Sequence, residues 1–143
     1  MPKKKSRLLY ISSLIIIFTL IFSAVGGAVN TTSPQNSALV YVEQGQKFQA
    51  QGENSKALDA YSQALALNPG QQEALYQRGV IYFSEGKYDQ ALSDFSLFIN
   101  MYPDNPESYQ YRAQIYLVNN DLSSALTDLQ KLIDLQPDSI YVP

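Results

Sequence analysis

Residues 72–105, QEALYQRGVIYFSEGKYDQALSDFSLFINMYPDN, contain the pattern that decides the fold of this 143-residue chain. Small residues and prolines of this stretch recur 34 positions earlier, later or both. They are Ala57, Ala91 and Ala125; Pro69, Pro103 and Pro137; Gly45 and Gly79; and Gly52 and Gly86. Self-similarity at this period is typical of stacked helical hairpins. The sequence therefore predicts an all-α solenoid rather than a single globular core.

The 34-residue step divides the body of the chain into three units, each of which reads as one helical hairpin. The units cover residues 38–71, 72–105 and 106–139. First helices are expected at 38–51, 72–85 and 106–119, and second helices at 54–67, 88–101 and 122–135. The expectation is six successive antiparallel helices.

Residues that start or stop helices separate these segments. A left-handed residue closes a helix, a short polar side chain caps the next one, and proline prevents continuation. The expected turn residues are Gly52, Gly86 and Asn120; the expected N-caps are near Ser55, Asp89 and Ser123; the expected stops are Pro69, Pro103 and Pro137; and Asn105 followed by Pro106 predicts a cap and a first helical residue.

Small and large residues recur in a way that suits close helix packing. Gly45 and its counterparts Gly79 and Ala113 fall in the first helices, and Ala57 and its counterparts fall early in the second helices. Two helices approach closely only where one side chain is small. The residues expected to pack into these slots are Phe48, Tyr82 and Tyr116; Tyr61, Phe95 and Leu129; and Ala64, Phe98 and Leu132.

This arrangement resembles the tetratricopeptide repeat, and the resemblance covers residues 38–139. The residues that carry it are Tyr41, Gly45, Phe48, Gly52, Ala57, Tyr61, Ala64 and Pro69; Leu75, Gly79, Tyr82, Gly86, Tyr88, Ala91, Phe95 and Pro103; and Tyr109, Ala113, Tyr116, Ala125, Leu129 and Pro137. The resemblance implies that the first helices line a concave groove, which in this family usually takes peptides or partner helices.

On this sequence the resemblance gives a set of groove-facing candidates. They are Val42, Gln46, Gln49, Glu73, Tyr76, Gln77, Val80, Phe83, Gln110, Tyr111, Gln114 and Leu117. The set is rich in amides and aromatic rings and mildly acidic, which suits an extended polypeptide or helix with apolar or basic residues. One subfamily grips a C-terminal carboxylate with Lys, Asn and Arg. The matching positions here, Val42, Gln46, Gln77, Glu107 and Tyr111, include no basic residue, so that activity is not expected.

Composition excludes several kinds of site. Beyond Asn30 the chain has six basic and thirteen acidic residues, a net charge of −7, which argues against binding a nucleic-acid backbone. There is no Cys and no His, so thiolate chemistry and the commonest general base and metal ligand are absent. With no nucleophile–base pair, phosphate loop or metal-ligand set in the sequence, we expect no catalysis, cofactor or metal.

The first thirty residues differ in kind from the rest. A basic cluster at residues 3–7 precedes the uncharged stretch LLYISSLIIIFTLIFSAV at residues 8–25. As a helix this stretch would span roughly 27 Å, close to the thickness of bilayer hydrocarbon. Basic residues before the apolar run predict a cytoplasmic N-terminus and a repeat domain on the non-cytoplasmic side of the membrane.

Two interpretations of residues 1–29 stay open. One is a retained transmembrane signal-anchor helix, and the other is a cleaved signal peptide with Gly26-Gly27-Ala28 as its cleavage site. A buried core helix is disfavoured, because a uniformly apolar cylinder has no place in a small solenoid. Residues 30–37 read as a polar linker and residues 140–143 as a short tail.

Several side chains allow more than one role. Arg78 and Arg112 could face a ligand, or could cover apolar surface and pair with Asp94 and Asp128 on the adjoining helix. Tyr61, Tyr82 and Tyr116 are expected in the core because of their packing positions. For Tyr76 and Tyr111 two roles stay open, contact with a ligand in the groove and simple exposure to solvent.

The C-terminal hairpin lacks a polar capping helix. Leu126, Leu129 and Ile133 have little sequence after them to cover their side chains, so either the tail folds back or a partner or second copy docks there.

The sequence patterns taken together suggest two functions. The first is a membrane-tethered scaffold that binds a polypeptide in its groove, as in complex assembly. The alternative is a secreted or periplasmic structural protein that self-associates.

Overall fold

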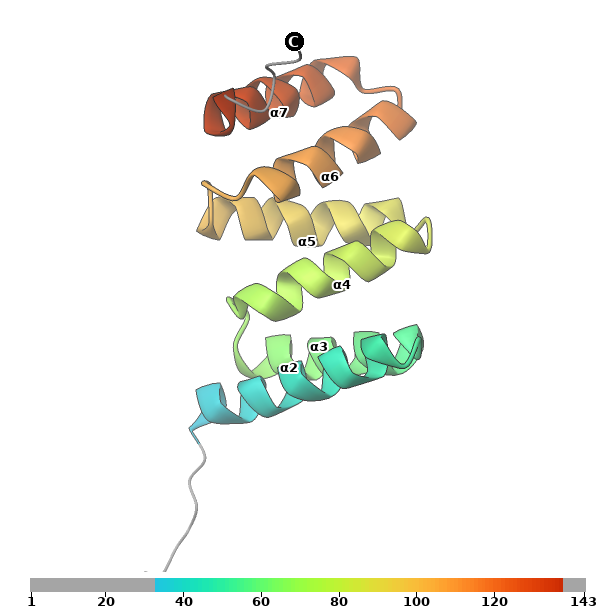
Figure 1. Ribbon diagram of the computed structural model, residues 1–143, viewed down its shortest axis with the longest axis vertical. Coiled ribbons are helices and arrows are strands. Elements are labelled where there is room, and N and C mark those ends of the chain that lie inside the picture. Colours follow the sequence, from blue (N-terminus) through green and yellow to red (C-terminus); the bar gives the residue numbers. More distant parts are fainter. Residues whose placement is uncertain (1–32, 138–143) are drawn as a thin grey trace, which may run out of the picture. The chain divides into compact units, whose positions relative to one another are not determined.

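The computed structural model describes residues 33–137, which form six α-helices and no strand. The helices are α2 (Pro34–Ala50), α3 (Asn54–Leu67), α4 (Gln72–Ser84), α5 (Tyr88–Met101), α6 (Pro106–Val118) and α7 (Leu122–Leu135). They run back and forth as three stacked hairpins in chain order (Figure 1). α3 packs on α4, and α5 packs on α6. The first helices of successive hairpins are also in contact, α2 with α4 and α4 with α6. The predicted solenoid of six antiparallel helices is confirmed.

The first helix begins earlier than the sequence pattern predicts. α2 starts at Pro34 rather than at residue 38, so residues 34–37 are its first turn and not a linker. The Ser33 side chain accepts a hydrogen bond from the Asn36 backbone N–H at 3.3 Å, and Pro34 follows in the first turn. A capping serine and an N-terminal proline are strong helix-start signals, and here they extend the helix beyond the repeat itself.

The second helices also begin before their predicted caps. Ser55, Asp89 and Ser123 lie inside these helices, because Glu53, Lys87 and Asp121 occupy the N-cap positions. The backbone carbonyl of each cap residue accepts a hydrogen bond at 3.0–3.1 Å from the N–H of the alanine that recurs every 34 residues. Only Asp121 of these three caps also accepts with its side chain, from the Ser124 N–H at 3.1 Å.

The predicted turn chemistry is confirmed. Gly52, Gly86 and Asn120 have φ angles of +75°, +71° and +59°, the left-handed backbone that closes each first helix. At the start of α6, the Asn105 side chain accepts the Ser108 N–H at 2.8 Å and Pro106 takes the first helical position.

Glycine in the first helices makes room for a ring from the second helices. A methyl group built on Gly45 would lie 2.5 Å from the Tyr61 ring, and one built on Gly79 would lie 3.1 Å from the Phe95 ring. Both rings are fully buried. The predicted knob-and-slot packing is therefore confirmed in the first two hairpins.

Tyr82 and Tyr116 depart from the predicted core assignment. Both are only half-buried, and a guanidinium lies 5.9 Å from each ring centroid, that of Arg78 for Tyr82 and that of Arg112 for Tyr116. Leu129 and Leu132 are likewise half-buried, since no further hairpin covers α7 among the described residues.

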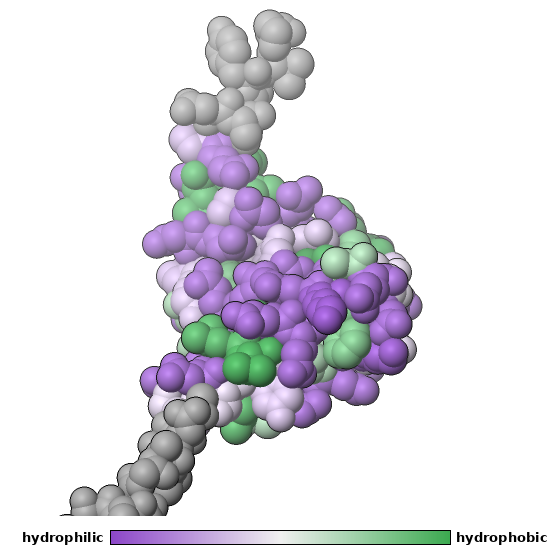
Figure 2. Space-filling view, turned by 60° about the horizontal axis from the view of Figure 1, so that its bottom comes forward, coloured by the Kyte–Doolittle hydropathy of each residue, from purple (hydrophilic) through white to green (hydrophobic). Residues whose placement is uncertain are grey.

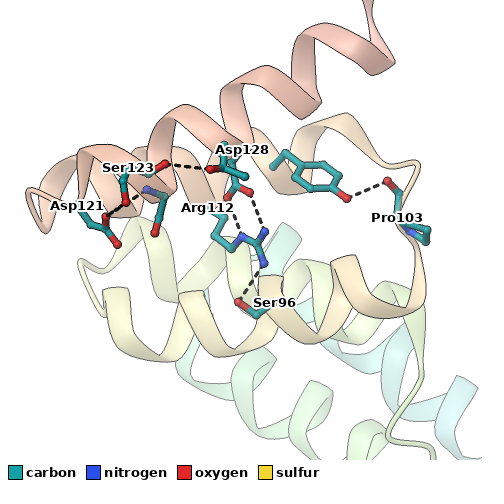
Figure 3. A network of polar contacts seen from close by, with 9 residues as sticks. Ser96, Pro103, Arg112, Asp121, Ser123 and Asp128 are labelled. Carbon is teal, nitrogen blue, oxygen red and sulfur yellow. Dashed lines mark hydrogen bonds and ion pairs between the residues drawn. The ribbon is translucent and has the colours of Figure 1, made fainter.

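Paired polar links join neighbouring hairpins. Arg112 on α6 donates to both carboxylate oxygens of Asp128 on α7 at 2.7 Å and to Ser96 on α5 at 3.4 Å (Figure 3). Arg78 on α4 does the same with Asp94 on α5 at 2.7 and 2.8 Å and with Ser62 on α3 at 3.1 Å. The predicted pairing with Asp94 and Asp128 is confirmed.

The predictions for the two ends of the chain concern residues outside the described range. The anchor or signal helix at 8–25 and the fold-back of residues 140–143 both lie there. Of the helices between Ser33 and Pro137, none combines the length and apolarity that a bilayer span requires.

Candidate partner-binding groove

The first helices place most of the predicted groove residues on adjoining surfaces. Where α2 meets α4, four polar side chains gather, which we call the amide zone: Gln46, Gln49, Glu73 and Gln77. Where α4 meets α6, aromatic and apolar side chains gather, which we call the aromatic zone: Tyr76, Val80, Phe83 and Tyr111.

The amide zone is a connected hydrogen-bond network. Gln49 donates to Gln77 at 3.2 Å, while Gln46 and Gln77 both donate to one oxygen of Glu73, at 3.3 and 2.9 Å. From the core side of the network, the hydroxyl of the buried Tyr61 donates to the Gln49 side-chain oxygen at 2.9 Å. These bonds hold α2 against α4 and fix the orientation of the amides before any ligand arrives.

The aromatic zone centres on Tyr111. Its ring stacks on Phe95 with centroids 5.0 Å apart and planes 2° apart, and it meets the edges of Phe83 at 5.1 Å and Tyr76 at 6.2 Å. Such stacked and edge-on pairs are the favoured aromatic geometries. Tyr76 and Tyr111 are therefore half-buried members of one cluster rather than isolated surface residues.

Two groove tyrosines have raised pKa values. Burial, followed by the charge of Glu73, raises the pKa of Tyr61 to about 12. Burial also raises the pKa of Tyr76 above its ordinary value, and Tyr111, Glu107 and Glu73 add to that effect. Both hydroxyls stay protonated at neutral pH, and that of Tyr61 donates to Gln49.

The remaining predicted residues are more scattered. Val42 belongs to the hydrophobic core with 5% of its surface exposed, so it offers little to a ligand and its groove assignment is corrected. Gln110 is exposed, Gln114 is half-buried, and Leu117 is 48% exposed near the end of α6. The helical period explains Val42, because its position on α2 faces the second helices rather than solvent.

Glu107 and Phe98 were not among the predicted groove-facing residues. Together with Glu73, Tyr76 and Gln77 they line a shallow hollow of about 320 Å³ at the step from α4 to α6. Glu107 lies 34 residues after Glu73, so the repeat period could have identified it as a groove residue from the sequence. Phe98 came from a second helix, and only the packing of the hairpins brings it to this surface.

The solvent-facing surface at the α2 end of the stack is mainly polar. In the view with the α2 end brought forward, hydrophilic residues dominate and hydrophobic residues form separate patches (Figure 2). A second hollow of about 410 Å³, lined by Gln72, Met101 and Tyr102 among others, lies at the turn between α5 and α6.

Comparisons with known proteins agree with the repeat architecture. The crystal structure of MamA is 25% identical with a TM-score of 0.65, over 75% of this chain and 60% of that one. The first TPR domain of Spaghetti (RPAP3), solved with the HSP90 peptide SRMEEVD, is 25% identical with a TM-score of 0.67, over 74% and 84%. YrrB, described as having an unusual peptide-binding site, is 27% identical with a TM-score of 0.64, over 71% and 53%.

The chain thus spans 60% of the MamA chain and about half of YrrB. A search of curated protein sequences gave no significant match. Two tetratricopeptide repeat family models match residues 45–116 and 107–139. With this match, the 34-residue period and the six stacked helices, the chain belongs to the tetratricopeptide repeat family.

Proposed function

We propose that this protein is an interaction scaffold that binds a polypeptide along its first helices. The observation that carries the proposal is the aromatic zone, where the half-buried Tyr76, Phe83 and Tyr111 cluster beside the ordered amide zone. Rigid aromatic anchors beside oriented polar groups are the usual composition of a peptide-binding surface. The peptide complex of Spaghetti and the peptide-binding site of YrrB give the same reading by analogy.

The finer part of the proposal is a membrane tether on the non-cytoplasmic side. It rests on the uncharged residues 8–25 behind the basic cluster at 3–7. A tether raises the local concentration of the domain near membrane partners without any new contact. Such an arrangement suits a factor that holds another protein during assembly of a membrane complex.

Site-directed photo-crosslinking tests the groove. A photoreactive residue is placed at Gln110 on α6, or at Gln63 on α3 as a matched exposed control. In cells, the Gln110 position should give discrete adducts with a partner, and the Gln63 position should give far fewer. Equal adducts from both positions, or none from Gln110, would contradict groove binding.

Membrane extraction tests the tether separately. The full chain should stay with membranes in alkaline carbonate and be released by detergent, and its intact mass should include residues 1–29. Release by carbonate, with a mass that begins after Ala28, would instead establish the cleaved-signal interpretation.

The exposed side of the last hairpin favours a second candidate function, self-association. Leu122, Leu126 and Ile133 on α7 are 59%, 68% and 42% exposed. Sedimentation of the full chain in detergent at rising concentration tests it. A dimer that the Leu126→Glu variant converts to monomer would support self-association, whereas a monomer at all concentrations would eliminate it.

A further inference from the structure

The hollow between α4 and α6 has a composition that selects for one kind of side chain. Glu73 and Glu107 are the second residues of α4 and α6, and both line it. The half-buried Tyr76 supplies aromatic surface to the same hollow, and the buried Phe98 also lines it. At about 320 Å³ it falls at the lower end of ligand-pocket volumes, which suits a single side chain of a longer ligand.

Both carboxylates keep capacity for a ligand. One oxygen of Glu73 accepts from Gln46 and Gln77, and one oxygen of Glu107 accepts from Asn105 at 2.9 Å. Within residues 33–137 the second oxygen of each accepts no further hydrogen bond. The hollow is acidic, because Glu73 and Glu107 both line it. Burial is the largest cause of the raised pKa of Tyr76, and the charges of Glu107 and Glu73 add to it.

Within residues 33–137, no cation neutralises these two carboxylates from inside the hollow. The residues that line it include no Lys or Arg. The arginines of the two helices, Arg78 and Arg112, are held by Asp94 and Asp128, each within its own hairpin. A bound partner that carries a positive charge would therefore complement Glu73 and Glu107.

We propose that this hollow is an arginine-selective subsite, which receives one arginine of a bound polypeptide. A guanidinium is planar and always charged, can donate in a fork to carboxylates, and stacks on aromatic faces such as that of Tyr76. Lysine offers only a point charge and fits this combination less well. The inference rests on the proposed function, because it names the chemistry of the polypeptide that the groove binds.

Peptide selection on the full 143-residue chain, kept in mild detergent, tests the subsite. A phage library of random 12-residue peptides is selected on the parent chain and on the double variant Glu73→Gln, Glu107→Gln. The control variant Asp59→Asn, Asp89→Asn has the same charge change at exposed positions on α3 and α5. Glutamine keeps an acceptor for Gln46 and Gln77, and circular dichroism verifies that each variant is folded.

The inference requires that peptides selected on the parent and on the control are enriched in arginine, and that the enrichment disappears with the double variant. Peptides that bind equally well without arginine would overturn the subsite while leaving groove binding intact. Failure of the parent chain to select any peptide would instead contradict the proposed function, and the subsite with it.

A synthetic peptide with the selected sequence gives the quantitative test. Replacing its arginine by citrulline, which has nearly the same shape without the charge, should weaken binding to the parent by about tenfold, as expected for a charge-assisted hydrogen-bonded pair. The same replacement should change binding to the double variant by less than about twofold, because the partner charges are gone. Equal weakening in both proteins would overturn the assignment to Glu73 and Glu107.

Discussion

The two junctions of the stack share their interior but differ at the groove. At each junction an arginine donates to an aspartate of its own hairpin and to a serine of the preceding hairpin, with similar distances at both junctions. On the groove side, the first junction presents hydrogen-bonded amides and the second presents packed rings. The repeat period thus specifies how hairpins stack, but it does not specify the residues on the groove side.

The polar links belong to the interior junctions of the described stack. In the first hairpin the positions that match Arg78 and Asp94 are Gln44 and Ala60, so no link starts there. In the third hairpin Gln130 stands where a serine would receive a following arginine, and it donates instead to Asp134 at 3.0 Å. The Arg–Ser bond of each link therefore needs a preceding hairpin, whereas the Arg–Asp pair lies within one hairpin.

The largest expected effect is the loss of one link. In the Arg78→Ala variant the Asp94 side chain, only 5% exposed, would lose its charge partner, and stability should fall by about 3–5 kcal/mol. Arg112→Ala should cost a similar amount at the other junction, because Asp128 is 4% exposed. Urea unfolding monitored by circular dichroism measures both. A cost below about 1 kcal/mol at either junction would show that the links are not equivalent supports.

The next effect appears at high pH and concerns Tyr61 at the first junction. The folded pKa of Tyr61 is about 12 against an ordinary value near 10, so the protonated hydroxyl stabilises the fold below pH 10 and that contribution is lost as pH rises toward 12. The loss should be on the order of 2 kcal/mol. Unfolding curves of the parent and of Tyr61→Phe, taken between pH 8 and 11.5, measure it. A parent curve that parallels the variant throughout would contradict the prediction.

The two glycine slots should differ in tolerance. Gly45→Ala would put a methyl group 2.5 Å from the buried Tyr61 ring, whereas Gly79→Ala would meet the Phe95 ring at 3.1 Å. We expect a cost of about 2–3 kcal/mol for the first and about 1 kcal/mol for the second, since overpacking a core costs roughly 1–3 kcal/mol. Thermal or urea unfolding ranks them. The reverse order would mean that the first hairpin adjusts more easily than the second.

The smallest effect concerns the turns. Gly86 and Asn120 occupy matching left-handed positions, with φ of +71° and +59°. Asn120→Gly should stabilise the third hairpin by up to about 1 kcal/mol, and Gly86→Ala should destabilise the second by about 1 kcal/mol. Paired unfolding curves provide the measurement. Destabilisation by Asn120→Gly would indicate that the asparagine side chain contributes more than the backbone geometry.

Most of the stack could be predicted from the chain, and the exceptions have physical reasons. Five of the six helices were placed within one residue, because Gly, Asn and Pro act locally on the backbone. α2 was missed at its start, since the Ser33 cap lies outside the repeat. Tyr82 was assigned to the core, but it lies half-buried at the edge of the core cluster, with the Arg78 guanidinium 5.9 Å from its ring centroid. A packing position in a repeat pattern does not distinguish the edge of the core from its interior.

The 34-residue pattern in the sequence determined the helices, their order and the Gly–aromatic packing, because each depends on residues within one hairpin or the next. Only the folded stack decided which side chains share the groove. It buried Val42 and joined Tyr111 to Phe95. It also brought Glu73, Glu107 and Phe98 around one hollow. Those neighbours come from separate helices, so their distances depend on how whole hairpins dock, which no local spacing encodes.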